Sequence, residues 1–123
     1  ALADTIGVGT PFEAGELFGK LGELLGRKIP MRAHFHNTRG TGIANAWEAW
    51  KAGVRVFDAS LGGLGGCPFA PRATGNIATE DLIYMMARSG VGTGIDLEAA
   101  IAANKWFAGE LGRELPSAVA RAA

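Results

Sequence analysis

Apolar residues recur along the chain with two different spacings, and each spacing predicts one type of element. Between Leu17 and Leu25 they recur every three or four residues with charged residues in between, which is the pattern of an amphipathic helix. The predicted apolar stripe of this helix consists of Leu17, Phe18, Leu21, Leu24 and Leu25. The preceding Thr10-Pro11-Phe12-Glu13 has the form of a capping box with proline in the first helical turn. We therefore predict a helix that begins after Thr10 and ends near Gly26.

Two later segments have the pattern of strands. Met31 to His36 alternates, so that Arg32, His34 and His36 project from one face and apolar residues project from the other. Val54 to Ser60 is short and mostly apolar, which favours a second strand.

Three further helices follow from the apolar spacing and from residues that can cap a helix. The first runs from Gly40 to Ala52. The second runs from Ile77 to Ser89 with Asn76 as its candidate N-cap, and the third runs from Leu97 to Leu111 with Asp96 as its candidate N-cap. The buried side of the first of these helices is expected to consist of Ile43, Ala46, Trp47 and Trp50.

The remaining stretch, Leu61 to Gly75, contains five glycines and two prolines. We predict an irregular loop, and loops of this length are usually functional or mobile. The strands and helices alternate, which implies parallel βα units. Because so few strands offer little sheet to cover on both faces, we predict an α/β fold that is the C-terminal part of a larger sheet or barrel.

Composition narrows the class of protein. The 123 residues are 48% apolar and 20% charged with a formal net charge of zero, which is typical of one globular domain and does not suggest binding to nucleic acid or to a membrane. A single cysteine and no visible signal peptide favour a cytoplasmic setting. The first residue is not Met, and Ala1 to Gly7 is typical of the end of a strand, so we expect a piece of a longer protein.

His34 and His36 are the only histidines of the chain. Residues two apart in a strand have Cβ atoms about 6 to 7 Å apart, so both imidazoles could bind one cation. The alternative is a pair of hydrogen-bonded, partly buried histidines. In a (β/α)₈ barrel, ligands bind at the carboxyl ends of the strands, and His36 leads directly into a loop.

Three other residues have one structural and one chemical interpretation. Cys67 is either a small buried apolar residue or a reactive thiol in the glycine-rich loop. Asn76 is either a helix cap or an oxygen ligand of a hard cation, and Asp4 either forms a turn or belongs to the site. The glycine run from Gly62 to Gly66 matches neither a Walker A loop nor a dinucleotide fingerprint, which disfavours nucleotide binding.

Four segments together resemble a known family: Asp4 to Pro11, His34 to Thr38, Gly62 to Ala70 and Thr74 to Asp81. They look like successive motifs of the 3-hydroxy-3-methylglutaryl-CoA lyase family, which belongs to the metal-dependent lyases on a TIM barrel. The resemblance implies that residues 1–123 are the C-terminal portion of a pyruvate-carboxyltransferase/HMG-CoA-lyase-like (β/α)₈ barrel domain. They would supply the end of the sixth strand, the seventh and eighth strands, and the C-terminal helices.

The resemblance also implies roles for single residues. His34, His36 and Asn76 match ligands of a Mg²⁺ or Mn²⁺ ion, with His34 also assisting proton transfer. Cys67 matches a catalytic thiol on a mobile loop, and Asp4 matches a substrate-binding aspartate. Enzymes of this family cleave 3-hydroxy-3-methylglutaryl-CoA to acetyl-CoA and acetoacetate.

One departure from the family pattern limits what this chain is expected to do. The family's first-strand Arg-Asp motif, which adds a metal ligand and a catalytic arginine, has no counterpart here, so we expect the isolated chain to be inactive. Its expected partners are an acyl-CoA substrate and either further copies of itself or a missing N-terminal half. The alternatives are a non-catalytic barrel fragment that self-assembles to cover its sheet edges, and a related acyl-CoA lyase or aldolase with a different substrate.

Overall fold

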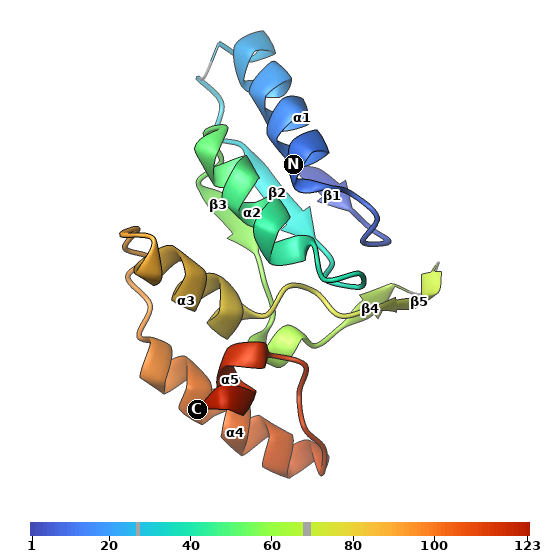
Figure 1. Cartoon of the computed structure of the whole chain (residues 1–123), viewed down its shortest axis with the longest axis vertical. Coiled ribbons are helices and arrows are strands. Elements are labelled where there is room, and N and C mark those ends of the chain that lie inside the picture. Colours follow the sequence, from blue (N-terminus) through green and yellow to red (C-terminus); the bar gives the residue numbers. More distant parts are fainter. Residues whose placement is uncertain (27, 68–69) are drawn as a thin grey trace.

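The computed structural model describes residues 1–26, 28–67 and 70–123, and of residues 67 and 70–74 it describes the backbone alone (Figure 1). Three strands, β1 (Leu2–Asp4), β2 (Arg32–Phe35) and β3 (Val56–Asp58), form a parallel sheet in the order β1-β2-β3. The connecting helices are α1 (Pro11–Leu24) and α2 (Gly42–Lys51). The predicted succession of parallel βα units is therefore confirmed.

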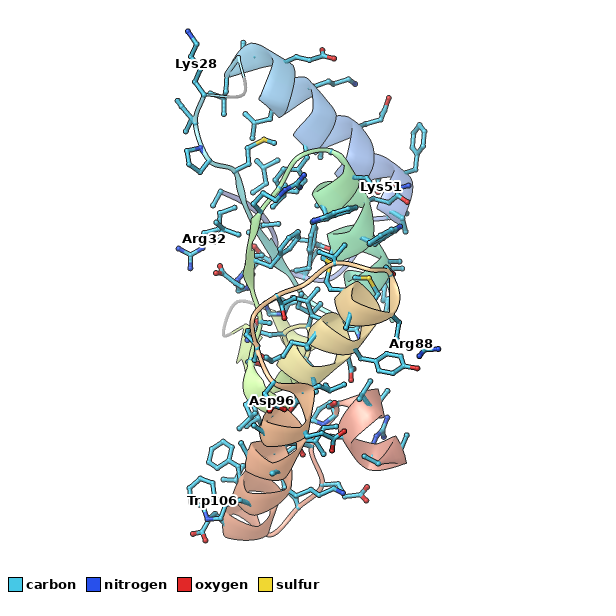
Figure 2. The ribbon with its side chains drawn as sticks, turned by 90° about the vertical axis from the view of Figure 1, so that its left-hand side faces the viewer. Lys28, Arg32, Lys51, Arg88, Asp96 and Trp106 are labelled. Atoms are coloured by element: carbon cyan, nitrogen blue, oxygen red, sulfur yellow. The ribbon has the colours of Figure 1, made fainter. Side chains whose placement is uncertain are left out.

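Both connecting helices lie on the same side of the sheet (Figures 1 and 2). Ala33 and Phe35 of β2 are 0% and 5% exposed on that side, and the Phe35 ring meets the Phe18 ring of α1 edge-on with their centroids 6.3 Å apart. The predicted alternation of β2 is thus confirmed. Burial of large apolar side chains on this face supplies most of the favourable free energy of folding in this part of the chain.

The helices cover the sheet with somewhat different residues from those predicted. On α1, Phe18 is buried, whereas Leu17 and Leu24 are 58% and 83% exposed. On α2 the prediction is confirmed for Ala46, while Ile43, Trp47 and Trp50 are half-buried and the buried side is completed by Gly42, Asn45 and Ala49.

The N-terminal end of α1 has the predicted capping box. The Thr10 hydroxyl accepts a hydrogen bond from the Glu13 amide at 3.3 Å, and the Glu13 carboxylate accepts one from the Thr10 amide at 2.9 Å. Two amides that the helix itself leaves without partners are satisfied in this way.

The stretch after β3 is more regular than predicted. Leu61–Gly63 forms one 3₁₀ turn, η1, and β4 (Gly66–Cys67) then pairs with β5 (Ala70–Thr74) as an antiparallel hairpin. The prediction of an irregular loop from Leu61 to Gly75 is wrong in this respect. Gly62, Gly63 and Gly65 have positive φ, a conformation that glycine adopts without strain, and they turn the backbone between β3 and β4.

Residues 75–78 then cross the carboxyl ends of two strands. The Ile77 amide donates to the Phe35 carbonyl at 3.2 Å, and the Ser60 amide donates to the Ile77 carbonyl at 3.1 Å. Because this backbone is extended, α3 (Thr79–Arg88) begins later than predicted, with Ala78 at its N-cap. The prediction that Asn76 caps this helix is wrong, since Asn76 instead forms an isolated antiparallel bridge with His36.

Two acidic residues at the start of α3 fasten the C-terminal helices, α4 (Leu97–Leu111) and α5 (Ala118–Ala122), to the rest of the chain. Glu80 is fully buried and accepts hydrogen bonds from the Gly62 amide at 3.0 Å and from Asn104 of α4 at 2.9 Å. Asp81 accepts hydrogen bonds from the hydroxyl of Ser117, the residue before α5, at 2.7 Å and from two amides of the same segment. Glu80 of α3 therefore links the glycine turn after β3 to α4.

The remaining cap prediction is confirmed. Asp96 is the N-cap of α4 and accepts a hydrogen bond from the Ala99 amide at 3.1 Å. Within the described part of the chain, none of the helices combines the length and the apolar character that a membrane crossing requires.

Candidate functional site

Polar side chains gather on the face of the sheet opposite to α1 and α2. Figure 2 shows Arg32 projecting from that face, away from the helices. His34 and His36 follow on the same face, as predicted, and their ring centroids lie 5.3 Å apart with the ring planes inclined by 49°. The His34 side chain is about one-third exposed, at 32%, whereas His36 is only 4% exposed. The strand geometry thus brings two imidazoles of different solvent access together.

His34 has a carboxylate partner that was missed in the sequence. The β2–β3 register pairs His34 with Asp58, and the His34 Nδ1 lies 3.2 Å from the Asp58 Oδ2. Arg32 donates through Nε to the other carboxylate oxygen of Asp58 at 2.7 Å. The sequence does mark Asp58 as an acidic residue near the end of an apolar strand. Which residue lies beside it depends on the register between β2 and β3, which the sequence pattern does not give.

The pKa of Asp58 is lowered from its ordinary value. The main cause is the hydrogen bond from Arg32, and the hydrogen bond with His34 acts in the same direction, whereas partial desolvation opposes both. Asp58 therefore presents a charged carboxylate to the His34 ring at neutral pH.

His36 has a different environment. Its Nδ1 is buried and has no hydrogen-bond partner among the described residues. Burial lowers the pKa of His36, and the neighbouring His34 lowers it further, while Asp4 opposes the shift. His36 is therefore neutral at pH 7, and neutral imidazole is the form that binds a metal ion.

Asn76 meets this pair through the backbone. The antiparallel bridge places Asn76 opposite His36, and directly opposite residues in such a pairing project to the same face. The Asn76 Nδ2 donates to the Leu64 carbonyl at 3.0 Å. A Cβ atom at Gly65 would lie 2.6 Å from that Nδ2, so glycine is required for this approach. Asn76 thus joins the base of the hairpin to the histidine pair.

Asp4 forms a turn in this structure. Its carboxylate accepts hydrogen bonds from the amides of Val8 at 3.1 Å and Gly9 at 2.9 Å. Its charge nevertheless acts on His36, whose pKa it tends to raise. The predicted substrate contact of Asp4 stays a prediction.

Three polar residues after β2, which the sequence pattern did not single out, donate hydrogen bonds to the loop between β1 and α1. Arg39 donates to the Ile6 carbonyl at 2.9 Å, and Thr41 and Asn45 each donate to the Gly9 carbonyl at 3.0 Å. The loops that follow β1 and β2 are therefore fixed to each other at the carboxyl edge of the sheet.

The described residues offer a partial set of metal ligands. The unpartnered Nδ1 of buried His36, the second imidazole beside it and the amide of Asn76 suit a divalent cation in donor type. Among the residues that the structure describes, no three His, Cys, Asp or Glu side chains lie close enough to share an ion. Cys67 takes part in β4 through its backbone, and its side chain lies outside the described residues.

Comparison with known proteins identifies relatives over nearly the whole chain. Residues 1–106 match the model of the HMGL-like family. The chain is 51% identical over 121 residues to an (R)-citramalyl-CoA lyase of Chloroflexus aurantiacus, and 48% identical over 115 residues to a hydroxymethylglutaryl-CoA lyase of Pseudomonas mevalonii. These alignments cover 98% and 91% of the chain but only 38% and 37% of the two relatives.

A solved structure of similar fold is also an HMG-CoA lyase, as one of the two sequence relatives is. An HMG-CoA lyase from Acinetobacter baumannii, in complex with coenzyme A and 3-methylmalate, superposes with a TM-score of 0.91 at 45% identity. The match covers 98% of this chain and 39% of that structure. The chain therefore spans less than half the length of the relatives it matches.

Proposed function

Because the chain belongs to the HMGL-like family, we propose that it is the C-terminal portion of a (β/α)₈ barrel enzyme that cleaves a carbon-carbon bond of a 3-hydroxy-3-methylacyl-CoA. The observation that carries this proposal is the polar cluster on the helix-free face of the sheet, where the rings of His34 and His36 lie side by side and the backbone of Asn76 pairs with that of His36. In barrels of this type, the site lies where the carboxyl ends of the parallel strands converge.

Cleavage of such a thioester needs two proton transfers. The tertiary hydroxyl must lose its proton, and the acetyl-CoA enolate that leaves must receive one. A Mg²⁺ or Mn²⁺ ion, when bound, would lower the pKa of the hydroxyl and stabilise the oxygen charge that develops. His34, His36 and Asn76 are the residues that would hold it.

The chain's own residues then account for the proton transfers. His34 has a single acceptor nitrogen, Nε2, because its Nδ1 faces Asp58, so it would either hold the ion or assist removal of the hydroxyl proton. It is the described candidate for the second role because it is partly exposed and its ring is held by Asp58. Cys67 stays the predicted donor to the enolate, on the family resemblance and its place beside the glycine turn. Asp4 stays the predicted substrate contact.

Two substrates are candidates. The first is 3-hydroxy-3-methylglutaryl-CoA, named by the relative from Pseudomonas mevalonii, and the second is (R)-citramalyl-CoA, named by the relative from Chloroflexus aurantiacus. The two acyl groups differ by one methylene, which a pocket distinguishes by roughly 10- to 200-fold in kcat/KM. The identities of 51% and 48% do not separate them, so both belong in the assay.

The proposal is tested with the full-length parent protein, the two thioesters and added Mn²⁺. We expect formation of acetyl-CoA that is lost in His34→Ala and in His36→Ala, together with Mn²⁺ binding in calorimetry. Lys28→Ala serves as the control, because Lys28 is exposed at the far end of the sheet from the cluster (Figure 2). Unchanged turnover in both histidine variants would show that the reaction, if there is one, occurs elsewhere.

A second candidate is a non-catalytic fragment that assembles with copies of itself. It is favoured by the exposed Leu17 and Leu24 of α1, which together with the outer edges of β1 and β3 suit association. Native mass spectrometry of the natural protein separates the two candidates. A multimer of a 12.7 kDa chain favours the fragment, and a longer polypeptide favours the lyase.

A further inference from the structure

The two histidines of the cluster are held in different ways, and the difference lies at Nδ1. The His34 Nδ1 faces the Asp58 carboxylate at 3.2 Å, whereas the His36 Nδ1 has no partner among the described residues. A carboxylate that is ionised can only accept a hydrogen bond. The His34 Nδ1 must therefore carry the hydrogen, which leaves the Nε2 of the neutral ring as its acceptor atom.

Asp58 is itself held from the other side. Arg32 lies two residues before His34 on the same face of β2, and its Nε donates to the Asp58 Oδ1 at 2.7 Å. The two carboxylate oxygens are thus divided between the two partners, Oδ1 to Arg32 and Oδ2 to His34. This arrangement limits rotation of the carboxylate, and through it the rotation of the His34 ring.

We propose that Asp58 is a positioning residue. Supported by Arg32, it fixes the ring orientation and the tautomer of His34, so that the Nε2 of His34 is the nitrogen that can bind the metal ion. The inference rests on the proposed function for its purpose, but its geometry does not depend on it. Metal-binding histidines commonly donate their second ring N–H to a carboxylate in this way, and removal of the carboxylate typically weakens metal affinity by about 10- to 100-fold.

A purely structural role makes a different prediction. If the Arg32-Asp58 pair only ties β2 to β3, it is a partly exposed ion pair of small energetic value, since the side chains are 57% and 28% exposed. Removing it would then alter neither the tautomer of His34 nor its affinity for a metal. The two roles are therefore separated by the state of the His34 ring.

The first measurement is ¹⁵N NMR of the metal-free, full-length parent protein, which reports which ring nitrogen of neutral His34 carries the hydrogen. The His34 signals are assigned through their loss in His34→Ala. We expect His34 to carry its hydrogen on Nδ1. In Asp58→Asn the shape is kept, but the side chain gains an NH₂ donor, and we expect the hydrogen to move to Nε2. A wild-type His34 with its hydrogen on Nε2 would overturn the proposal, whatever the variants do.

The second measurement is Mn²⁺ affinity by calorimetry. We expect an affinity about 10- to 100-fold weaker in Asp58→Asn and a smaller loss in Arg32→Met. Asp96→Asn is the matched control, because it removes a carboxylate of equal charge from the N-cap of α4, where asparagine caps equally well. Wild-type affinity in Asp58→Asn, with affinity lost in His34→Ala, would overturn the role of Asp58 while leaving the proposed metal site intact.

The two measurements also separate this inference from the proposed function. If the wild-type protein binds no Mn²⁺, the proposed metal site fails, and the NMR result alone decides whether Asp58 sets the tautomer. A hydrogen on Nδ1 that depends on Asp58 then still supports the positioning role.

Discussion

Along β2, residues one position apart in the sequence lie in opposite environments. Ala33 and Phe35 are 0% and 5% exposed beneath α1 and α2, whereas Arg32 and His34 project from the other face and remain partly exposed. The apolar face gains its stability within this chain, by burial against two helices. On the polar face, Asp58 instead pairs with both Arg32 and His34, and the His34 ring stays partly exposed.

The comparison leads us to expect that stability and the proposed function are divided between the two faces of one strand. Substitutions on the helix-covered face should therefore change the free energy of unfolding. Substitutions on the open face, which carries Arg32, His34 and His36, should change ligand binding. They should lower the free energy of unfolding little, or raise it.

The largest effect is expected on the helix-covered face. Phe35→Ala removes a buried ring that contacts Phe18, and we expect the free energy of unfolding of the full-length protein to fall by about 3 to 5 kcal/mol. Denaturant titration measures the change. Leu24→Ala on α1 is the control, since that side chain is 83% exposed and its removal should change stability by at most about 0.5 kcal/mol. Equal losses in both variants would contradict the division between the faces.

The next effect concerns the glycine turn between β3 and the β4–β5 hairpin. Gly62 has φ of 64°, and a Cβ atom there would lie 2.5 Å from the Leu115 side chain. We expect Gly62→Ala to destabilise the protein by about 2 to 4 kcal/mol, the sum of left-handed strain and overpacking. Gly92→Ala is the matched control, because nothing lies within 4 Å of a Cβ atom at Gly92. A thermal shift as small in the first variant as in the second would contradict the tight packing at Gly62.

On the open face, a substitution should separate stability from function. His36→Leu replaces a buried ring whose Nδ1 has no described partner, and we expect the free energy of unfolding to rise by about 1 kcal/mol because an unsatisfied buried group is removed. The same variant should lose Mn²⁺ binding in calorimetry. A variant that is strongly destabilised would show that His36 belongs to the core rather than to a site.

The smallest effect is a pH dependence at the cap of α1, the helix that covers the apolar face. Hydrogen bonds from the Thr10 amide and then from its hydroxyl lower the pKa of Glu13 below 4.5 in the folded protein. The folded state thus holds its proton less tightly than the unfolded state, so the stabilisation by Glu13 is present above the unfolded pKa and is lost as pH falls through the folded pKa. We expect the difference in thermal stability between wild type and Glu13→Gln to shrink below about pH 4.5. A constant difference from pH 7 to pH 3 would contradict this account.

Much of the local structure could be predicted because its causes lie within a few residues. The capping box of Thr10 and Glu13 and the N-cap of Asp96 each depend on contacts three residues apart, and the structure confirms them. The alternation of β2 likewise placed the two histidines on one face. The family itself could be predicted from four short motifs.

The tertiary structure decided the pairings between distant segments. Asn76 has the local chemistry of a helix cap, yet the backbone around it pairs with β2 and β3, so that it lies opposite His36 and the helix begins at Thr79. The helix does not begin at Asn76 because the extended backbone of residues 75–78 satisfies its hydrogen bonds elsewhere. Its partners include Phe35 of β2 and Ser60, which follows β3.

By itself, the sequence determined the βα order, the caps and the two histidines on a common face, because period and capping depend on near neighbours. Only the tertiary structure decided that Asp58 lies beside His34 and that the two imidazoles differ, one held by a carboxylate and the other buried without a described partner. The register between β2 and β3 fixes that difference, and it joins residues 24 positions apart that no local pattern connects.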